Sequence, residues 1–400
     1  MKKDKLVARV ARCWKRQCPA EFKKPCWARR KMLSAPGVNL YGYVFSEIGL
    51  GQAARLVADA IATQPLPLNI VRRELPGRES IDAFHDRVFP PAPFSTNVTV
   101  VGAPELAQLR GEICRQQFNI VYPFWELEKL PKKLVDYCKE FDSFWAPSQF
   151  IFDCLKAEQS QPVHLVKQPV QLPNANPTLG LNGDTLRILT YFDFDSFPAR
   201  KNPEAAVNAF RAAFPTKQAD VSLTVKTRGK ADHGRRAWLE KQAAQDARIK
   251  IIDKTLNDFE MSALMRDHDI FLSLHRSEGF GLGCAEALIA GRAVVATDYG
   301  GTTDFINAET GYPVAWDSIE LREGDYIGWE GAHWADPSID HAAAILLRIY
   351  DDPEAARLKT KQGLDLLRRE HSFEVIGRRI VEALKNDGVP YSRNEALLGI

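Results

Sequence analysis

Two glutamates, Glu278 and Glu286, stand eight residues apart in a glycine-rich stretch of the chain. An apolar run at 269–274 predicts a buried strand before the first glutamate, and a helical pattern runs from about 282 to 290. The first backbone N–H groups of a helix have no intrahelical partners and lie at the positive end of its dipole, so they favour an oxygen-rich anion. Each carboxylate accepts hydrogen bonds from hydroxyls. The spacing therefore suits a ligand that is both anionic and rich in hydroxyls, such as a sugar nucleotide.

The sequence from Ser277 to Glu286 resembles the Glu-x7-Glu signature of family 4 glycosyltransferases. These are retaining enzymes of the GT-B fold that use nucleotide-sugar donors. The resemblance implies that the donor sugar meets Glu278 and the amides after it, and that Glu286 binds the ribose hydroxyls. The amides in question belong to Gly279, Phe280, Gly281 and Leu282. The alternative is a surface loop with two solvated glutamates.

A donor diphosphate gains negative charge as the sugar departs, so cations and amide dipoles must lie beside it. Arg200 and Lys201 follow the first strand of the second half of the chain and precede a helix that begins at Pro203. They resemble the family's Arg-x4-Lys-Gly element, in which Lys201 matches the lysine. Ser196 stands at the arginine position, and we expect Arg200 to replace that arginine. The alternative is a solvated pair at a helix start.

A second glycine-rich turn, Gly49-Leu50-Gly51, lies in the first half. Gly49-x-Gly51-x-x-Ala54 also fits the dinucleotide-binding fingerprint, with Glu74 as the ribose acid. Three residues separate the predicted strand from Gly49, whereas that fingerprint has its glycine at the strand end. The turn resembles instead the Gly-Leu-Gly loop of family 4 glycosyltransferases, which implies that its amides approach the donor phosphates.

Other polar residues follow predicted strands and should face the same cleft. Glu126 is a candidate for binding the acceptor hydroxyl at a position where many relatives have His, and Trp125 beside it suits either a sugar ring or core packing. Lys226 and Asp304 are candidates for the donor pocket, Asp304 because its turn resembles the family's Gly-Gly-x-x-Glu. We expect His275 to be structural.

Composition restricts the class of protein. The chain has 400 residues, 45% of them hydrophobic, with no apolar run long enough to cross a bilayer and no secretory signal pattern, so we expect a cytoplasmic protein. Its seven cysteines are scattered, which argues against a disulfide framework. Asp193-x-Asp195 has the spacing of metal-dependent transferases of a different fold. We therefore expect no metal and no cofactor, only a GDP- or UDP-linked sugar as substrate.

The charge is unevenly distributed. Residues 1–33 hold twelve Lys or Arg and two acids, a net +10, and because the whole chain carries +2 the other residues carry −8. Leu6, Val10 and Trp14 lie on one face of a basic helical pattern. Such a helix is typical of binding to an anionic membrane surface, and a solvated tail is the open alternative. The acidic remainder argues against nucleic acid as a partner.

Short apolar strands alternate with helical patterns along the chain, which predicts two doubly wound, Rossmann-like α/β domains. We expect a leader at 1–34, an N-terminal acceptor-side domain at 35–178, and a C-terminal nucleotide-sugar-binding domain at 179–373, with 374–400 crossing back to the first domain as in GT-B enzymes. Predicted strands are 38–45, 68–73, 98–102, 119–123, 143–146, 163–170, 186–194, 221–226, 249–252, 270–274, 293–297 and 312–314. Predicted helices are 51–63, 104–112, 131–140, 148–157, 282–290, 338–351, 353–369 and 373–385.

The sequence thus predicts a retaining glycosyltransferase that moves a hexosyl unit, mannose being the best guess, to a glycan or lipid-linked acceptor. The residues of the signature resemble those of bacterial enzymes of O-antigen, capsule or exopolysaccharide synthesis. The leader would hold such an enzyme at the inner face of the membrane. No candidate nucleophile stands out, so we expect a front-face mechanism. The alternatives are a nucleotide-sugar epimerase of the same fold and a non-catalytic, membrane-surface nucleotide-sugar-binding protein.

Overall fold

The computed structural model describes residues 35–73, 75, 92–109, 116–181, 183, 185–216, 220–230 and 234–391. The described residues belong to one compact unit, and every contact below lies within it. The predictions about the leader, about Glu74 and about the residues after Tyr391 lie outside the described residues. In the described part of the chain, no helix has the length and apolarity needed to cross a membrane.

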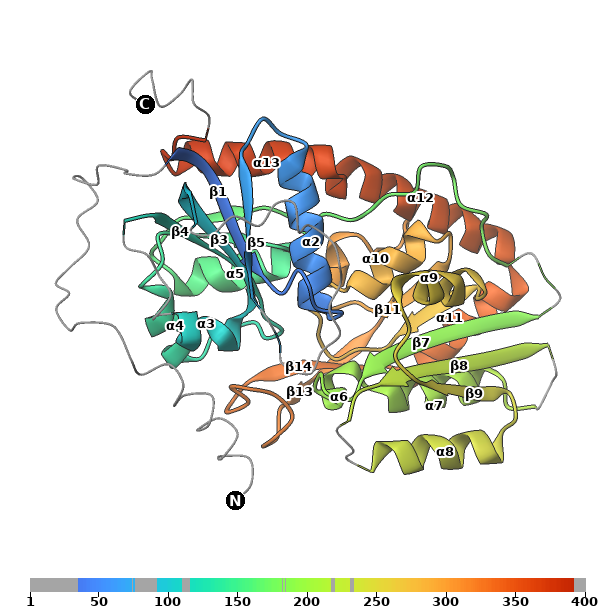
Figure 1. The fold of residues 1–400 in the computed structure, drawn as a ribbon. Helices are drawn as coiled ribbons and strands as arrows, with labels where there is room; N and C mark the ends of the chain where they lie inside the picture. The colour runs from blue at the N-terminus through green and yellow to red at the C-terminus, as the bar shows by residue number, and fades with distance from the viewer. Residues whose placement is uncertain are drawn as a thin grey trace. The chain divides into compact units, whose positions relative to one another are not determined.

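The first half of this unit is a parallel sheet in the strand order β2-β1-β3-β4-β5-β6, with helices on both faces (Figure 1). Side chains alternate between the two faces: Ile120 packs with α2, and Val121 packs with the cluster under α3, α4 and α5. Strands buried on both faces give continuous apolar runs, which is why the sequence predicts them well. The strands are β1 (Ala35–Gly42), β2 (Leu68–Arg72), β3 (Phe94–Gly102), β4 (Phe118–Phe124), β5 (Ser143–Ala146) and β6 (Val163–Leu165).

The helices of the first half include one from the end of the chain. They are α2 (Gly49–Ala62), η3 (Ala103–Glu105), α3 (Leu106–Leu109), α4 (Lys132–Cys138), α5 (Gln149–Glu158) and α13 (Phe373–Asn386). Ile376 and Ile380, one helical turn apart in α13, are buried in the same cluster as α2. A Cβ at Gly377 would lie 2.6 Å from the Ala60 carbonyl oxygen, so glycine permits this close packing. The predicted return of the last helix to the first domain is confirmed.

The second half repeats the architecture, with strand order β12-β11-β10-β7-β8-β9. Alternation again separates the two faces, since Ile270 and Leu272 pack under α7, α8 and α11, and Phe271 packs under α10 and α12. The strands are β7 (Leu186–Asp193), β8 (Val221–Arg228), β9 (Ile249–Asp253), β10 (Ile270–Ser273), β11 (Ala293–Thr297) and β12 (Tyr312–Val314). The helices are α6 (Pro198–Lys201), α7 (Pro203–Ala213), α8 (Arg235–Gln245), α9 (Asp258–Arg266), α10 (Leu282–Ile289), η4 (Gly301–Asp304), α11 (Ile339–Asp351) and α12 (Pro353–His371).

The helices α6, α8 and α9 were not predicted from the sequence, nor was a hairpin that follows β12. Between β12 and α11 the chain makes an antiparallel hairpin of β13 (Trp316–Glu320) and β14 (His333–Pro337). Its buried Leu321, Tyr326 and Trp334 belong to the same apolar cluster as α3, α4 and α5 of the first half. The hairpin therefore extends from the second half of the chain and packs against the first.

Several predicted elements differ from the structure at their ends, and β3 begins at Phe94 rather than near 98. β1 ends at Gly42 rather than near 45, because the Ser46 amide donates to the Tyr43 carbonyl and starts a turn. β6 ends at Leu165 rather than near 170, because the Val166 amide donates to the His164 carbonyl at 3.1 Å and starts a turn. The helix predicted at 104–112 begins as the short η3 followed by α3, and residues 110–115 are not described.

A row of asparagines crosses the first sheet near the amino ends of its strands. Asn39 is in register with Asn69 and Asn97, and Asn97 with Asn119. All four are at most 5% exposed. The Asn39 amide donates to Asn97 Oδ1 at 2.9 Å, and the Asn97 amide to Asn119 Oδ1 at 3.0 Å. A slip of one residue would break these pairs, so the asparagine row fixes the strand register.

Candidate active site

The centre of the site is the loop between β10 and α10. Gly281 caps α10 with φ of +88°, a left-handed conformation that favours glycine. The helix after it begins with Leu282, Gly283 and Cys284, and a Cβ at Gly283 would lie 2.4 Å from the Tyr191 hydroxyl, so glycine permits the close approach of that tyrosine. This is the strand-turn-helix frame that the sequence predicts, and it presents the positive end of a helix beside Glu278.

The short helix α6 is fastened to that loop. The Arg276 amide donates to the Arg200 carbonyl at 2.8 Å, and the Arg276 guanidinium donates to the Ala199 carbonyl at 2.8 Å. The Asn202 side chain donates to the Leu274 carbonyl at 3.1 Å. Phe197 and Asn202, which flank α6, have φ of +49° and +50°. Left-handed backbone is costly for a bulky residue such as Phe197, so this local fold is held by its surroundings.

Glu278 binds both predicted cations. Arg200 Nη1 lies 3.1 Å from one carboxylate oxygen, and the Lys201 ammonium donates to the other. Burial alone would raise the pKa of Glu278, but Arg200 and Lys201 outweigh burial and hold this pKa well below its ordinary value. Glu278 is therefore a carboxylate at neutral pH, and the substitution of Arg200 for the family's missing arginine is geometrically feasible.

The first half reaches the same cluster through Glu126. Arg200 Nη2 lies 3.8 Å from Glu126, and the Tyr326 hydroxyl of the hairpin donates to the other Glu126 oxygen. The Tyr326 ring lies 5.4 Å from the Trp125 ring and 4.8 Å from the Phe197 ring. Arg200, only 4% exposed, thus joins carboxylates from both halves of the chain.

Glu286 lies further along α10 and accepts a hydrogen bond from the Tyr191 hydroxyl at 3.1 Å. Burial raises the pKa of Glu286 to about 7; the Tyr191 hydrogen bond opposes this shift, and Asp258 adds to it. Lys226 is in register with Tyr191 on the neighbouring strand, so the two share one face of the sheet. Burial lowers the pKa of Lys226 to about 8, helped by Arg228 and opposed by Asp193.

The Gly49-Leu50-Gly51 turn forms the start of α2, after an apolar Ile48 that has no polar atom to cap the helix. Its amides therefore lie at a helix N-terminus at the carboxyl end of the first sheet. A Cβ on Gly51 would overlap the Ser46 and Tyr43 carbonyls, which explains that glycine. Leu282 at the start of α10 packs on the apolar cluster that contains α2. The contact of this turn with donor phosphates stays a prediction.

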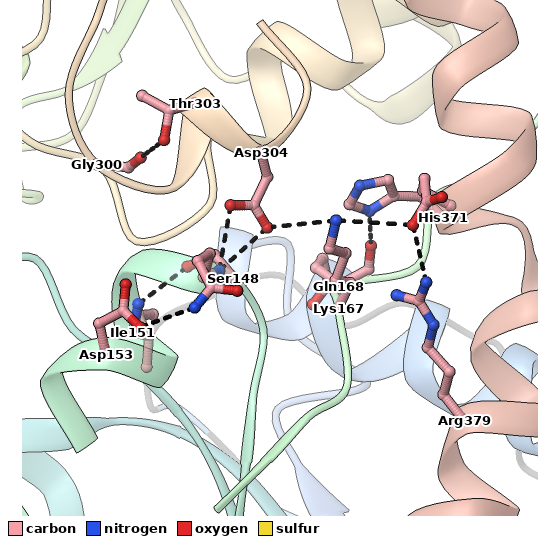
Figure 2. A network of polar contacts seen from close by, with 12 residues as sticks. Ser148, Ile151, Asp153, Lys167, Gln168, Gly300, Thr303, Asp304, His371 and Arg379 are labelled. Carbon is pink, nitrogen blue, oxygen red and sulfur yellow. Dashed lines mark hydrogen bonds and ion pairs between the residues drawn. The ribbon is translucent and has the colours of Figure 1, made fainter. Parts of the chain in front are cut away.

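Asp304 is bound to the first half rather than to the loop cations. Its two oxygens accept from the Gln149 amide at 3.2 and 3.1 Å, at the start of α5, and Lys167 lies 3.9 Å away (Figure 2). His275 is fully buried between Ser273 and the Tyr299 carbonyl, and burial lowers its pKa to about 4. A structural role for His275 agrees with these contacts.

The Asp193 and Asp195 carboxylates bind groups of the protein itself. Asp193 pairs with Arg228 at 2.9 Å and accepts from the Asp195 amide, and Asp195 accepts from the Lys230 amide at 3.1 Å. Within the described ranges, no group of three or more His, Cys, Asp or Glu side chains is arranged to hold a metal ion.

Three residues of this region were missed from the sequence. Tyr326 lies 200 positions from Glu126 along the sequence. Ser148 donates to the Gly279 carbonyl at 2.6 Å and lies 131 positions before Gly279. Tyr191 lies 95 positions from Glu286. Only Tyr191 had a local signal, since it stands near the end of a predicted strand.

Comparison with known protein families gave a match to part of the second half of the chain. Residues 194–323 match the family described as glycosyl transferases group 1. That segment contains Arg200, Lys201, Lys226, Glu278 and Glu286. No curated protein shows significant similarity to the chain.

Solved structures are similar over most of the chain. Sucrose-phosphate synthase from Thermosynechococcus elongatus has 15% identity and a TM-score of 0.65, covering 88% of this chain and 98% of that one. HepE from Anabaena, in complex with UDP and glucose, has 11% identity and a TM-score of 0.62, with coverages of 88% and 100%. TarM from S. aureus, in complex with UDP and saccharides, has 12% identity and a TM-score of 0.55; it covers 72% of this chain, and the chain spans about half of TarM's length, 55%. These likenesses establish the fold, and the predicted GT-B architecture is confirmed.

Proposed function

We propose that this protein is a retaining GT-B glycosyltransferase that moves a hexosyl unit from a nucleotide sugar to a hydroxyl of a glycan or lipid-linked acceptor. The observation that carries the proposal is the contact of Glu278 with both Arg200 and Lys201 at the start of α10. It places two cations, a helix N-terminus and a carboxylate together, which suits a ligand that is an anion at one end and a polyol at the other.

In this proposal the cations bind the donor diphosphate. The Lys201 side chain is 25% exposed, so its ammonium can reach a phosphate oxygen, whereas the Arg200 side chain is 5% exposed and acts as a buried charge behind it. The amides of 279–282 and the Glu278 carboxylate orient the hexose, and Glu286 accepts the ribose hydroxyls. Lys226, on the same face as Tyr191, supplies a further cation, and the Gly49–Gly51 amides approach the phosphates from the first half.

The reaction then breaks the bond between the anomeric carbon and the phosphate oxygen and forms a bond from that carbon to the acceptor oxygen. The electron pair of the broken bond goes to the diphosphate, whose oxygen takes the acceptor proton on the same face of the sugar. Arg200 and Lys201 stabilise the charge that develops on the leaving group. Glu126, held by Tyr326, binds the acceptor hydroxyl, with Trp125, Phe197 and Tyr326 forming the aromatic surroundings of that position.

For the donor nucleotide and the pathway we propose classes rather than single compounds. UDP is the first nucleotide to test, because HepE and TarM are described in complex with it. GDP-mannose is the second, because the signature resembles those of bacterial mannosyltransferases that build surface polysaccharides. The basic leader would hold the enzyme at the cytoplasmic face of the membrane, where lipid-linked acceptors are found.

The test is a donor panel with the full-length protein. UDP-glucose, UDP-N-acetylglucosamine and GDP-mannose are incubated with and without a mixture of glycoside acceptors, and products are followed by proton NMR. We expect slow donor hydrolysis without acceptor and an α-configured product from an α-linked donor. A β product would refute retention, an epimerised donor without acceptor would indicate the epimerase, and binding without turnover would indicate the non-catalytic alternative.

A further inference from the structure

The start of α5 in the first half docks on the Glu278 loop of the second half through the contact of Ser148 with Gly279. Ser148, fully buried, is the N-cap of α5: its hydroxyl oxygen accepts from the Ile151 amide at 3.3 Å. The same hydroxyl donates to the Gly279 carbonyl at 2.6 Å. One side chain thus ends a helix of the first half and fixes a peptide group of the second.

Gly279 packs closely against the first half of the chain around Ser148. A Cβ at this glycine would lie 3.0 Å from the Trp125 carbonyl oxygen and 3.2 Å from Ile151 Cδ1, both in the first half. On the opposite side, the Gly301 amide donates to the Glu278 carbonyl at 2.7 Å. The peptide groups of Glu278 and Gly279 are therefore held from two sides, by the first half and by the turn at Gly300–Gly301.

The next residue of α5 strengthens the same contact. The Gln149 amide donates to the Asp304 side chain, which is 3% exposed. Asp304 is the last residue of the η4 turn that supports Glu278. Lys167 lies between Asp304 and Glu370, and Glu370 pairs with Arg379 of α13 at 2.8 Å. Figure 2 shows this chain of ionic contacts running from α5 to α13.

We propose that Ser148 is a positioning residue for Glu278. By fixing the Gly279 carbonyl it aims the Glu278 carboxylate and the amides of 280–282, so the donor site is complete only when the first half is in contact with the loop. This inference rests on the proposed function, which places Glu278 at the donor sugar. Its consequence is that a residue outside the donor site controls donor turnover.

The experiment compares Ser148→Ala with Ser148→Thr, which keeps the hydroxyl, and with a matched control. Ser338→Ala removes the N-cap hydroxyl of α11, which accepts from the His341 amide at 3.2 Å, without touching the loop. Hydrolysis of UDP-glucose, or of the panel donor hydrolysed fastest, is measured with the full-length variants. We expect Ser148→Ala to lower kcat about tenfold to a hundredfold with little change in KM, and Ser148→Thr to recover most of it.

Amide hydrogen exchange of the unliganded proteins gives a second readout that needs no activity. We expect the amides of 279–282 to exchange at least about threefold faster in Ser148→Ala and to be unchanged in Ser338→Ala. Unchanged exchange in this segment, or a kcat equal to that of Ser338→Ala, would overturn the inference. If the wild-type protein hydrolyses no donor, the proposed function fails, while the exchange comparison still decides whether Ser148 holds the loop.

Discussion

Glu286 should make nucleotide binding dependent on protons. Its pKa is raised to about 7 by burial beside Tyr191, and ribose hydroxyls bind best to the ionised carboxylate. A raised pKa means that the free protein carries this proton below pH 7 and must release it when the nucleotide binds. The affinity for the nucleotide should therefore be highest above pH 7 and should fall as the pH drops through that value.

The magnitude follows from the pKa. With a value of about 7, Glu286 is about 0.9 protonated at pH 6 and about 0.1 protonated at pH 8, so binding should release about 0.9 and 0.1 protons and weaken about tenfold between these two conditions. Glu286→Gln keeps the size of the side chain and an acceptor for Tyr191 but cannot titrate. At pH 8, Glu286→Ala should weaken binding by about 1.5 to 3 kcal/mol, as expected for a hydrogen bond to a charged group.

The assay is calorimetric titration with UDP, and with GDP if UDP does not bind, in two buffers of different ionisation enthalpy at pH 6, 7 and 8. The diphosphate itself titrates near pH 6, so the quantity of interest is the difference between wild type and Glu286→Gln. Equal proton release by the two proteins at pH 6, with both folded, would refute the reasoning, and an unchanged affinity of Glu286→Ala at pH 8 would remove Glu286 from the ribose site.

Three further predictions concern separate parts of the chain. Lys201→Ala should lower kcat about a hundredfold or more with a smaller effect on KM, whereas Lys254→Ala, at a lysine 60% exposed, should not; a normal kcat would exclude Lys201 from the site. Asn97→Ala leaves buried amide groups unpaired, which should lower the free energy of unfolding by about 1 to 3 kcal/mol. Calorimetry should show a melting temperature lower by several degrees, and kinetics at a permissive temperature should show an unchanged kcat. Deleting 1–33 should abolish salt-sensitive sedimentation with anionic vesicles and leave donor hydrolysis intact; equal sedimentation of both forms would return the leader to a solvated tail.

The sequence predicts the strands well because parallel strands buried on both faces are short apolar runs between polar or glycine-rich turns. β5, β11 and β12 begin and end at the predicted residues. The β13–β14 hairpin was missed, because tryptophans and acids mixed along it give no clear alternation. Its pairing and its position on the first half depend on contacts that lie far apart in the chain.

Some contacts of the candidate site could also be predicted from the sequence, and others could not. Arg200, Lys201 and Glu278 follow neighbouring strands of one parallel sheet, so their meeting could be expected from strand order alone. The roles of Ser148 and Tyr326 could not, because they depend on how one half faces the other. The contact of Asp304 with the Gln149 amide could not be predicted for the same reason, and the proposed contact of Asp304 with the donor pocket stays a prediction.

The position of α13 has a consequence for how the protein is made. Thr63 and Phe373, which are 310 residues apart, lie at the contact between α2 and α13. At about 5 to 20 residues per second, a ribosome needs about 15 to 60 s to pass from the first of these helices to the second. During that interval the nascent first half lacks the cover that Ile376 and Ile380 later provide, and such exposed apolar surface favours aggregation or binding by chaperones.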